Sequence, residues 1–267
     1  MAYSVVVLMF VVIPLVLCLI NIIRLQIPLK HFGAAAISLL SIVLFYAVPW
    51  DHQAAIWHMW TWRHTATVGW YIWSLPIEEY AFMVALTLLI ISIYAFATQK
   101  SFVNTLQRFK NILDIMLIGI GVTVAFLLLS LFHSMSEIPR THPMYLAFLL
   151  LWAGPVILLQ WGVGGRICWQ QRHLIIAIAI GAMTWFGLAD VIALHFTIWR
   201  FSATDLLGWY IGPVPIEEEL FYGLTAVMLG QGYLILMALV SSGVLARIPH
   251  LHLGWRSQQT VSQKGQL

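Results

Sequence analysis

Long, uninterrupted runs of apolar residues dominate the chain, and short polar stretches separate them. Each run is close to the roughly 20 residues that a helix needs to cross a bilayer. Because lipid requires every backbone polar group to be paired internally, and because the runs do not alternate, we interpret them as helices. The pattern predicts seven transmembrane spans, at residues 3–23, 32–50, 76–97, 112–132, 143–161, 173–194 and 215–240.

The composition supports an all-α integral membrane protein. Of the 267 residues, 61% are hydrophobic and only 9% are charged, whereas soluble domains carry roughly 25% charged residues. The first span has no basic region before it and no small-residue cleavage site after it, so we expect it to be retained. The two cysteines, Cys18 and Cys168, suggest neither a disulfide framework nor a metal site.

The basic residues indicate how the helices are oriented. Ten of the 13 fall in loops or tails on the side of the membrane opposite Met1, and the other three, Arg63, Arg140 and Arg200, fall on the side of Met1. The positive-inside rule then predicts a cell-membrane protein with its N-terminus outside and its C-terminus in the cytoplasm. This distribution also accounts for the sequence pI of about 9.0, so no nucleic-acid partner is expected.

The chain repeats itself at an offset of 139 residues without a gap. The segment Gly69-Trp70-Tyr71-Ile72 matches 208–211, Pro76-Ile77-Glu78-Glu79 matches 215–218, and Asp51 matches Asp190. We therefore predict two three-helix repeats, at 1–97 and 140–245, joined by a connector at 98–139 that carries the fourth span, with a polar tail at 246–267. Three helices per repeat would by themselves invert the second copy in the membrane. The single helix of the connector restores its direction, so the two repeats are predicted to be parallel.

Acidic residues concentrate in the repeated stretches, which hold eight of the ten. Carboxylates within membrane helices are costly and indicate function. Adjacent helical residues point about 100° apart, so one Glu of each pair can face the bundle interior while the other faces a neighbouring helix or the interface. The preceding prolines suit the first helical turn. We expect Asp51 and Asp190 to act as loop anchors or as partners of the glutamates.

Other candidate features carry less information. The aromatic residues before each Glu pair fit an interfacial belt or a pocket that stabilises a cation, and the sequence leaves both open. His52, His58 and His64 are spaced by six, which matches no usual zinc site. The segment 162–165, Gly-Val-Gly-Gly, is expected in a loop and lacks the preceding strand of a dinucleotide fingerprint.

The duplicated Pro-x-Glu-Glu-x-x-Phe motif, with Gly-Trp-Tyr before it and an upstream Asp, resembles the lycopene cyclase domain family, in its fused single-chain form. The motifs end in Phe82 and Phe221. The family often has two aromatics in a row there; Phe221-Tyr222 keeps this pattern and Phe82-Met83 does not.

The resemblance implies an acid-catalysed, non-redox cyclisation of the ends of lycopene to β-ionone rings, giving γ- or β-carotene, without a cofactor or metal. An acid protonates the terminal double bond, the next double bond attacks the cation, and a base removes a proton. The partners implied are a lipid-soluble carotenoid and membrane lipid, with an association with other carotenoid enzymes left open. The implied catalytic residues are Glu78, Glu79, Glu217 and Glu218; the implied supporting or cation-stabilising residues are Asp51, Asp190, Pro76, Pro215, Phe82, Phe221, Trp70, Tyr71, Trp209 and Tyr210.

Four alternatives differ in their requirements. A retinal photoreceptor needs a lysine in the last helix, and 215–240 contains none. An intramembrane CAAX-type protease pairs its Glu-Glu with a downstream Arg and helical His ligands, whereas here both pairs are followed by apolar helix with no Arg. A proton-coupled transporter that uses the glutamates as a relay, and a carotenoid hydratase or another carotenoid-modifying enzyme, stay open.

Overall fold

The structure is a computed structural model, and it describes residues 1–98 and 144–241. In these ranges six helical segments are long and apolar enough to cross a membrane: Tyr3–Arg24, Leu29–Ile56, Ile77–Thr98, Met144–Gln170, Arg172–His195 and Ile216–Val240. They coincide with six of the seven predicted spans. The span predicted at 112–132, most of the connector and the tail lie outside the described residues.

The first two spans are each built from three consecutive helical pieces. The first comprises α1 (Tyr3–Val7), a π-helical turn (Leu8–Val12) and α2 (Ile13–Arg24); the second comprises α3 (Leu29–Ile42), a second π-helical turn (Val43–Ala47) and α4 (Val48–Ile56). A proline, Pro14 or Pro49, follows each π turn by two residues. Proline removes a helical hydrogen bond and clashes with the preceding turn, and a π turn is one way to accommodate it within a continuous helix.

Two predicted boundaries were wrong. The second span continues to Ile56, six residues beyond the prediction, so Asp51 lies in helix α4 and not in a loop. The glycines at 162–165 lie inside α7 (Met144–Gln170), where Gly164 takes a non-helical conformation (φ −134°, ψ 23°) and kinks the helix. Asp190 likewise lies in a helix, α8 (Arg172–His195).

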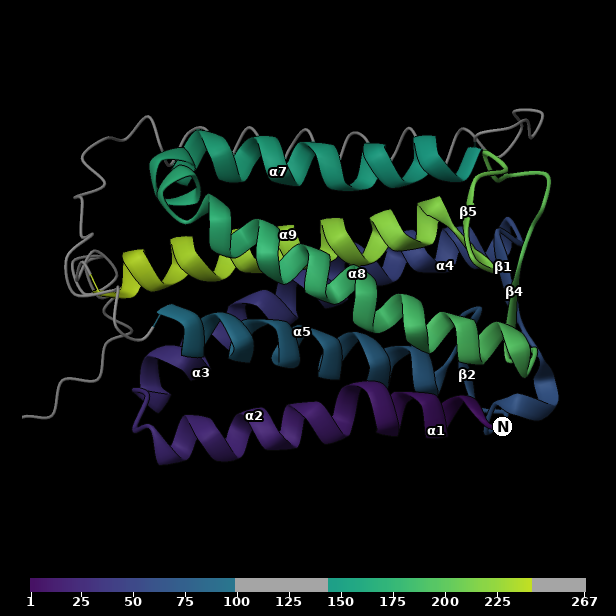
Figure 1. Ribbon diagram of the computed structural model, residues 1–267, viewed down its shortest axis with the longest axis horizontal. Coiled ribbons are helices and arrows are strands. Elements are labelled where there is room, and N and C mark those ends of the chain that lie inside the picture. The colour runs from purple at the N-terminus through teal and green to yellow at the C-terminus, as the bar shows by residue number, and fades with distance from the viewer. Residues whose placement is uncertain (99–143, 242–267) are drawn as a thin grey trace, which may run out of the picture.

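The described helices form one elongated bundle in which α9 (Ile216–Ser241) is central. It packs against α3, α5 (Ile77–Thr98), α7 and α8. The helices that begin at α1, α5, α7 and α9 all start at the end of the bundle where the strands lie, and α3–α4 and α8 run back toward that end (Figure 1). Corresponding helices of the two halves therefore run in the same direction.

Short antiparallel strands cover that end of the bundle. Strand β1 (Trp60–Trp62) pairs with β4 (Trp199–Phe201) in the register Trp60↔Phe201, Thr61↔Arg200 and Trp62↔Trp199. Two further pairs, β2 (Tyr71–Ile72) with β3 (Leu75–Pro76) and β5 (Tyr210–Ile211) with β6 (Val214–Pro215), lead directly into α5 and α9. The β1–β4 ribbon thus joins the two halves, because each half contributes one strand.

The two matching loops before α5 and α9 have the same backbone path. In each the glycine of the Gly-Trp-Tyr segment, Gly69 or Gly208, has φ of +87°, a conformation that L side chains rarely adopt. The following tryptophan accepts a hydrogen bond from the first helical residue: Ile77 N–H to Trp70 O and Ile216 N–H to Trp209 O, both at 2.9 Å. This explains why the Gly-Trp motif stands at a fixed distance from each Glu pair.

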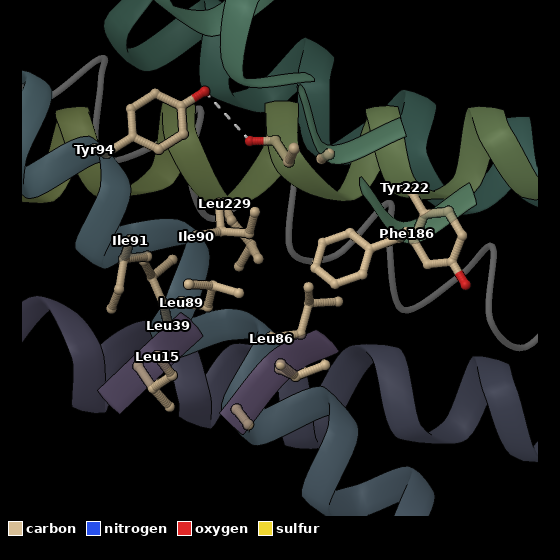
Figure 2. Close-up of a cluster of buried hydrophobic side chains, with 14 of the residues drawn as sticks. Leu15, Leu39, Leu86, Leu89, Ile90, Ile91, Tyr94, Phe186, Tyr222 and Leu229 are labelled. Atoms are coloured by element: carbon tan, nitrogen blue, oxygen red, sulfur yellow. Dashed lines mark hydrogen bonds between the residues drawn. The ribbon is translucent and has the colours of Figure 1, made fainter. Parts of the chain in front are cut away.

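Helix α5 packs in the apolar interior between α2, α3 and α9. Figure 2 shows Leu86, Leu89 and Ile90 of α5 lying between Leu15 and Leu39 on one side and Leu229 on the other. The Tyr94 hydroxyl donates to the Ala226 carbonyl at 3.4 Å. A Cβ at Gly230 would overlap the Tyr94 ring, so the glycine allows this close approach.

Large apolar side chains cover the outside of the bundle. Phe45, Leu158, Ile37 and Ile23 are between 66% and 83% exposed. A continuous apolar surface of this kind would drive association in water. It fits a chain whose outer face contacts lipid.

Candidate active site

An elongated cavity of about 700 Å³ lies between the two halves of the bundle. Its lining on α9 extends from Glu218 to Leu239, a rise of about 30 Å at 1.5 Å per residue. That length is comparable with the thickness of a bilayer's hydrocarbon core, about 30 Å. The cavity therefore suits a long, thin ligand lying along the helices.

The carboxyl groups that line the cavity gather at the end covered by the β1–β4 ribbon. They are Asp51, Glu79 and Glu218. The ribbon residues that face this space alternate with exposed ones: Trp60, Trp62, Trp199 and Phe201 line the cavity, whereas Thr61 and Arg200 are exposed. This alternation follows from the two-residue period of a strand.

Each half contributes one glutamate to the cavity together with a tyrosine that binds it. The Tyr3 hydroxyl of α1 donates to Glu79 Oε2 at 2.6 Å, and the Tyr145 hydroxyl of α7 donates to Glu218 Oε2, also at 2.6 Å. Hydrogen bonds to an ionised carboxylate are short and strong. The two tyrosines therefore fix the rotamers of the two glutamates and offset part of the cost of burying them as anions.

The other glutamate of each pair holds the preceding loop. Glu78 Oε1 accepts the Val68 backbone N–H at 2.6 Å, and Glu217 Oε1 accepts the Leu207 N–H at 2.5 Å. Both side chains are buried, and neither residue lines the cavity. The expectation that one glutamate of each pair faces the interior is thus met in both halves by the second residue of the pair.

The two aspartates lie beside the glutamates, the second of the two positions expected for them. Asp51 and Asp190 are 5% and 0% exposed, within α4 and α8. Asp51 interacts with Trp60, and Asp190 interacts with Trp199, which occupies the matching position in the other half. Only Asp51 lines the cavity; Asp190 lies behind Tyr222, whose hydroxyl donates to Asp190 Oδ1 at 3.1 Å.

The carboxyl groups of the two aspartates and of the two cavity-lining glutamates, Glu79 and Glu218, interact with one another electrostatically. Asp51 interacts with Glu79 and Glu218, and Glu218 also interacts with Asp190. Among the described residues, the cavity lining contains no Lys, Arg or His. Four anions without a counter-cation cannot coexist in a low-dielectric site. Some of the group must be protonated, which is what acid–base chemistry requires.

Stacked aromatic rings form one wall near the acids. Trp50 stacks on Trp152 with centroids 4.6 Å apart and on Phe148 at 4.9 Å, and Phe221 lies parallel to Trp50 at 5.9 Å. Trp50, Trp152 and Phe221 line the cavity. Aromatic faces attract cations, so this wall can stabilise a positive charge that forms beside the carboxyl groups.

The sequence matches the lycopene cyclase family model over residues 1–97 and 142–236. The chain belongs to the lycopene cyclase family. The lycopene beta-cyclase of Halobacterium salinarum is 31% identical over 74% of this chain and 79% of its own length. The bifunctional lycopene cyclase/phytoene synthases of Podospora anserina and Aspergillus oryzae are 28% and 24% identical, over 80% and 73% of this chain and 36% and 33% of theirs. No solved structure matches.

The structure divides the supporting residues expected from the lycopene cyclase resemblance into two groups. Phe82 and Phe221 line the cavity, as expected of residues beside the reacting group. Trp70, Trp209 and Tyr210 are between 51% and 72% exposed, and neither they nor Tyr71 line the cavity. They fit the interfacial belt, whereas Trp60, Trp62 and Trp199 belong to the pocket.

The two motif prolines stand directly before the helices that carry the glutamates. Pro76 and Pro215 are buried at the last position of β3 and β6, one residue before the helix and not within its first turn. Each is the register partner of a tyrosine, Tyr71 or Tyr210, in the preceding strand. They set the point at which α5 and α9 begin, and with it the direction of the glutamates.

Sequence reasoning missed the three tyrosines of this lycopene cyclase site. Tyr3 and Tyr145 are 142 residues apart, so the ungapped comparison at 139 did not align them. A comparison that allowed three extra residues would have paired them. Tyr222 was seen only as an aromatic of the motif, because its bond to Asp190 depends on how α8 and α9 pack.

Proposed function

We propose that this chain is a lycopene β-cyclase of carotenoid biosynthesis, which cyclises the acyclic end groups of lycopene to β-ionone rings and so forms γ- or β-carotene. The observation that carries the proposal is the placement of Glu79 and Glu218, one from each half, in a single apolar cavity beside stacked aromatic rings. Membership of the family and the name of the Halobacterium relative support the substrate class.

The geometry supports a cyclisation in three steps. The end group of a linear hydrocarbon enters the acid-lined end of the cavity while the rest of the chain lies along α9. A carboxylic acid protonates the terminal double bond, and the next double bond attacks the resulting tertiary cation to close the ring. A carboxylate then removes a proton from the ring, so the sum of the steps is an isomerisation that needs no electrons. General acid–base catalysis of this kind contributes on the order of 10²–10⁴-fold each.

The four motif glutamates take different parts in this proposal. Glu79 and Glu218 are in position to exchange protons with the substrate, because they line the cavity. Glu78 and Glu217 position the loops before α5 and α9 through Val68 and Leu207. The assignment of catalysis to all four is therefore narrowed to the second glutamate of each pair, with the first acting through the backbone.

The proposed setting is the cell membrane, with the N-terminus outside and the C-terminus in the cytoplasm. The basic bias of the loops supports this orientation. Arg200 lies in the β1–β4 ribbon and Arg63 directly follows it, and both belong to the side of Met1, which this orientation places outside. The carboxyl groups that the ribbon covers would then lie near the outer surface of the membrane. Two parallel repeats, at 1–97 and 140–245, would each supply one cavity-lining glutamate.

Expression in a lycopene-accumulating bacterial host tests the function. We expect the cells to convert lycopene to cyclic carotenoids, detected by pigment chromatography. A hydratase would instead yield hydroxylated acyclic pigment, and a transporter would leave the pigments unchanged. Neither alternative is favoured by the cavity, which apart from its few carboxyl and other polar side chains is walled by apolar residues in the described part of the chain.

A further inference from the structure

The two halves of the site differ at one position that matters for proton transfer. Tyr222 follows Phe221 in α9, and its hydroxyl binds Asp190 at 3.1 Å. The position 139 residues earlier is Met83, which follows Phe82 in α5 and lines the cavity. A thioether cannot donate a hydrogen bond, so Asp51 lacks the hydroxyl donor that Asp190 has.

Asp51 is also placed differently with respect to the cavity. It is only 5% exposed and lines the cavity, whereas Asp190 does not. Its carboxyl group has a hydrogen bond from the Trp60 side chain, and its Oδ2, like Asp190 Oδ2, has no hydrogen-bond partner in the described part of the chain. By contrast, Glu79, Glu218 and Asp190 each accept a hydrogen bond from a tyrosine. Donated hydrogen bonds favour a carboxylate over a carboxylic acid.

A proton shared among these groups is therefore best placed on Asp51. The other three carboxyl groups keep their tyrosine donors when ionised, whereas an anion at Asp51 would face two neighbouring glutamates without a tyrosine donor. A protonated Asp51 avoids that repulsion and presents an O–H to the cavity.

We propose that Asp51 is the proton donor that starts the cyclisation, and that Glu79 or Glu218, held by its tyrosine, is the base that ends it. The inference rests on the proposed function and assigns roles within it. The Asp51 O–H bond breaks as a C–H bond forms at the end group, and the ring closes. The glutamate then takes a proton from the ring as a C=C bond forms, and that proton returns to Asp51.

The matched pair Asp51→Asn and Asp190→Asn tests the donor. We expect Asp51→Asn to lower the rate of lycopene cyclisation by on the order of 10²–10⁴-fold, at unchanged protein level in the membrane. Asp190→Asn should cost less, because that side chain does not line the cavity. Equal losses, or near-normal activity of Asp51→Asn, would overturn the proposal.

A second substrate separates proton donation from a structural role. Protonation of an epoxide oxygen needs a much weaker acid than protonation of an alkene carbon. Purified Asp51→Asn should therefore still close the ring of an acyclic carotenoid with a 1,2-epoxide end group: a remaining protonated carboxyl group gives its proton to the epoxide oxygen as the C–O bond breaks, and a hydroxylated ring forms. The double variant Glu79→Gln/Glu218→Gln should fail with both substrates. Loss of both activities in Asp51→Asn would make Asp51 structural and refute the assignment.

A gain of the missing hydroxyl provides an independent test. In Met83→Tyr, position 83 gains a tyrosine hydroxyl like the one that Tyr222 donates to Asp190. Met83→Phe adds a ring of nearly the same size without the hydroxyl. We expect Met83→Tyr to be slower than Met83→Phe, and equal rates would contradict the proposal. If the unaltered protein does not cyclise lycopene at all, the proposed function itself fails, which the wild-type control in each assay reveals.

Discussion

The two glutamates of each motif should respond differently to the same substitution. Glu→Gln preserves shape and removes the titrating proton. At whichever of Glu79 and Glu218 acts as the base, we expect a rate loss on the order of 10²–10⁴-fold, which is about 3–5 kcal/mol of activation free energy at 1.36 kcal/mol per tenfold. The protein should still accumulate in the membrane, because a glutamine oxygen can accept the bond from Tyr3 or Tyr145.

Substitution of the first glutamate of each pair should lower the stability of the protein more than its reaction rate. After Glu78→Gln or Glu217→Gln, the amide oxygen of the new side chain can still accept the loop N–H. Only the difference between a charged and a neutral hydrogen bond is lost, about 1 kcal/mol. We expect a lower unfolding temperature in detergent and a rate within about tenfold of wild type.

The assay is pigment formation from lycopene in isolated membranes, normalised to the amount of folded protein. Glu219→Gln is the control, since its counterpart in the first half is Tyr80 and it does not line the cavity. Losses of equal size at all four motif positions would refute the division of roles. Near-normal rates at all four would make the carboxylates structural and the acid–base scheme wrong.

Three further predictions concern topology, cofactors and product order. Reporter fusions at Lys110 and at the C-terminus should both read cytoplasmic; a periplasmic result at both would reverse the orientation. Purified protein in lipid should convert lycopene without flavin or nicotinamide, and a strict need for reduced flavin would contradict the non-redox scheme. Because the glutamates of both halves share one cavity, only one end group reacts per binding event, so monocyclic pigment should precede dicyclic pigment in a time course; simultaneous appearance would argue against a single site.

The sequence predicted the large features of the fold because they depend on local chemistry. Continuous apolar runs marked six helices that the structure describes, and the gapless repeat identified both Glu pairs. The end of the second span was misjudged because Asp51-His52-Gln53 reads as a polar loop. In the structure this turn stays helical, since Asp51 faces the cavity and His52 bonds Ser74.

Which glutamate of a pair faces the cavity depended on tertiary structure. The 100° step between neighbours showed that the two must diverge, but either could have been the inner one. The loop from Gly69 to Ser74 decides the matter, because it brings the Val68 N–H to Glu78 and leaves Glu79 to the cavity. No periodicity in the sequence carries that information, which lies in the path of a loop with positive φ at Gly69.

In the proposed mechanism the duplicated motif builds one reaction centre and not two, and this makes its small asymmetry important. An isomerisation by proton addition and removal needs a donor and an acceptor that differ in character. Two identical half-sites would supply two equal carboxyl groups, and neither would be favoured for either step. The change from a tyrosine at 222 to a methionine at 83 removes one hydrogen-bond donor from one half only. In the proposed mechanism this one difference between the repeats makes Asp51 the acid, and a glutamate held by its tyrosine acts as the base.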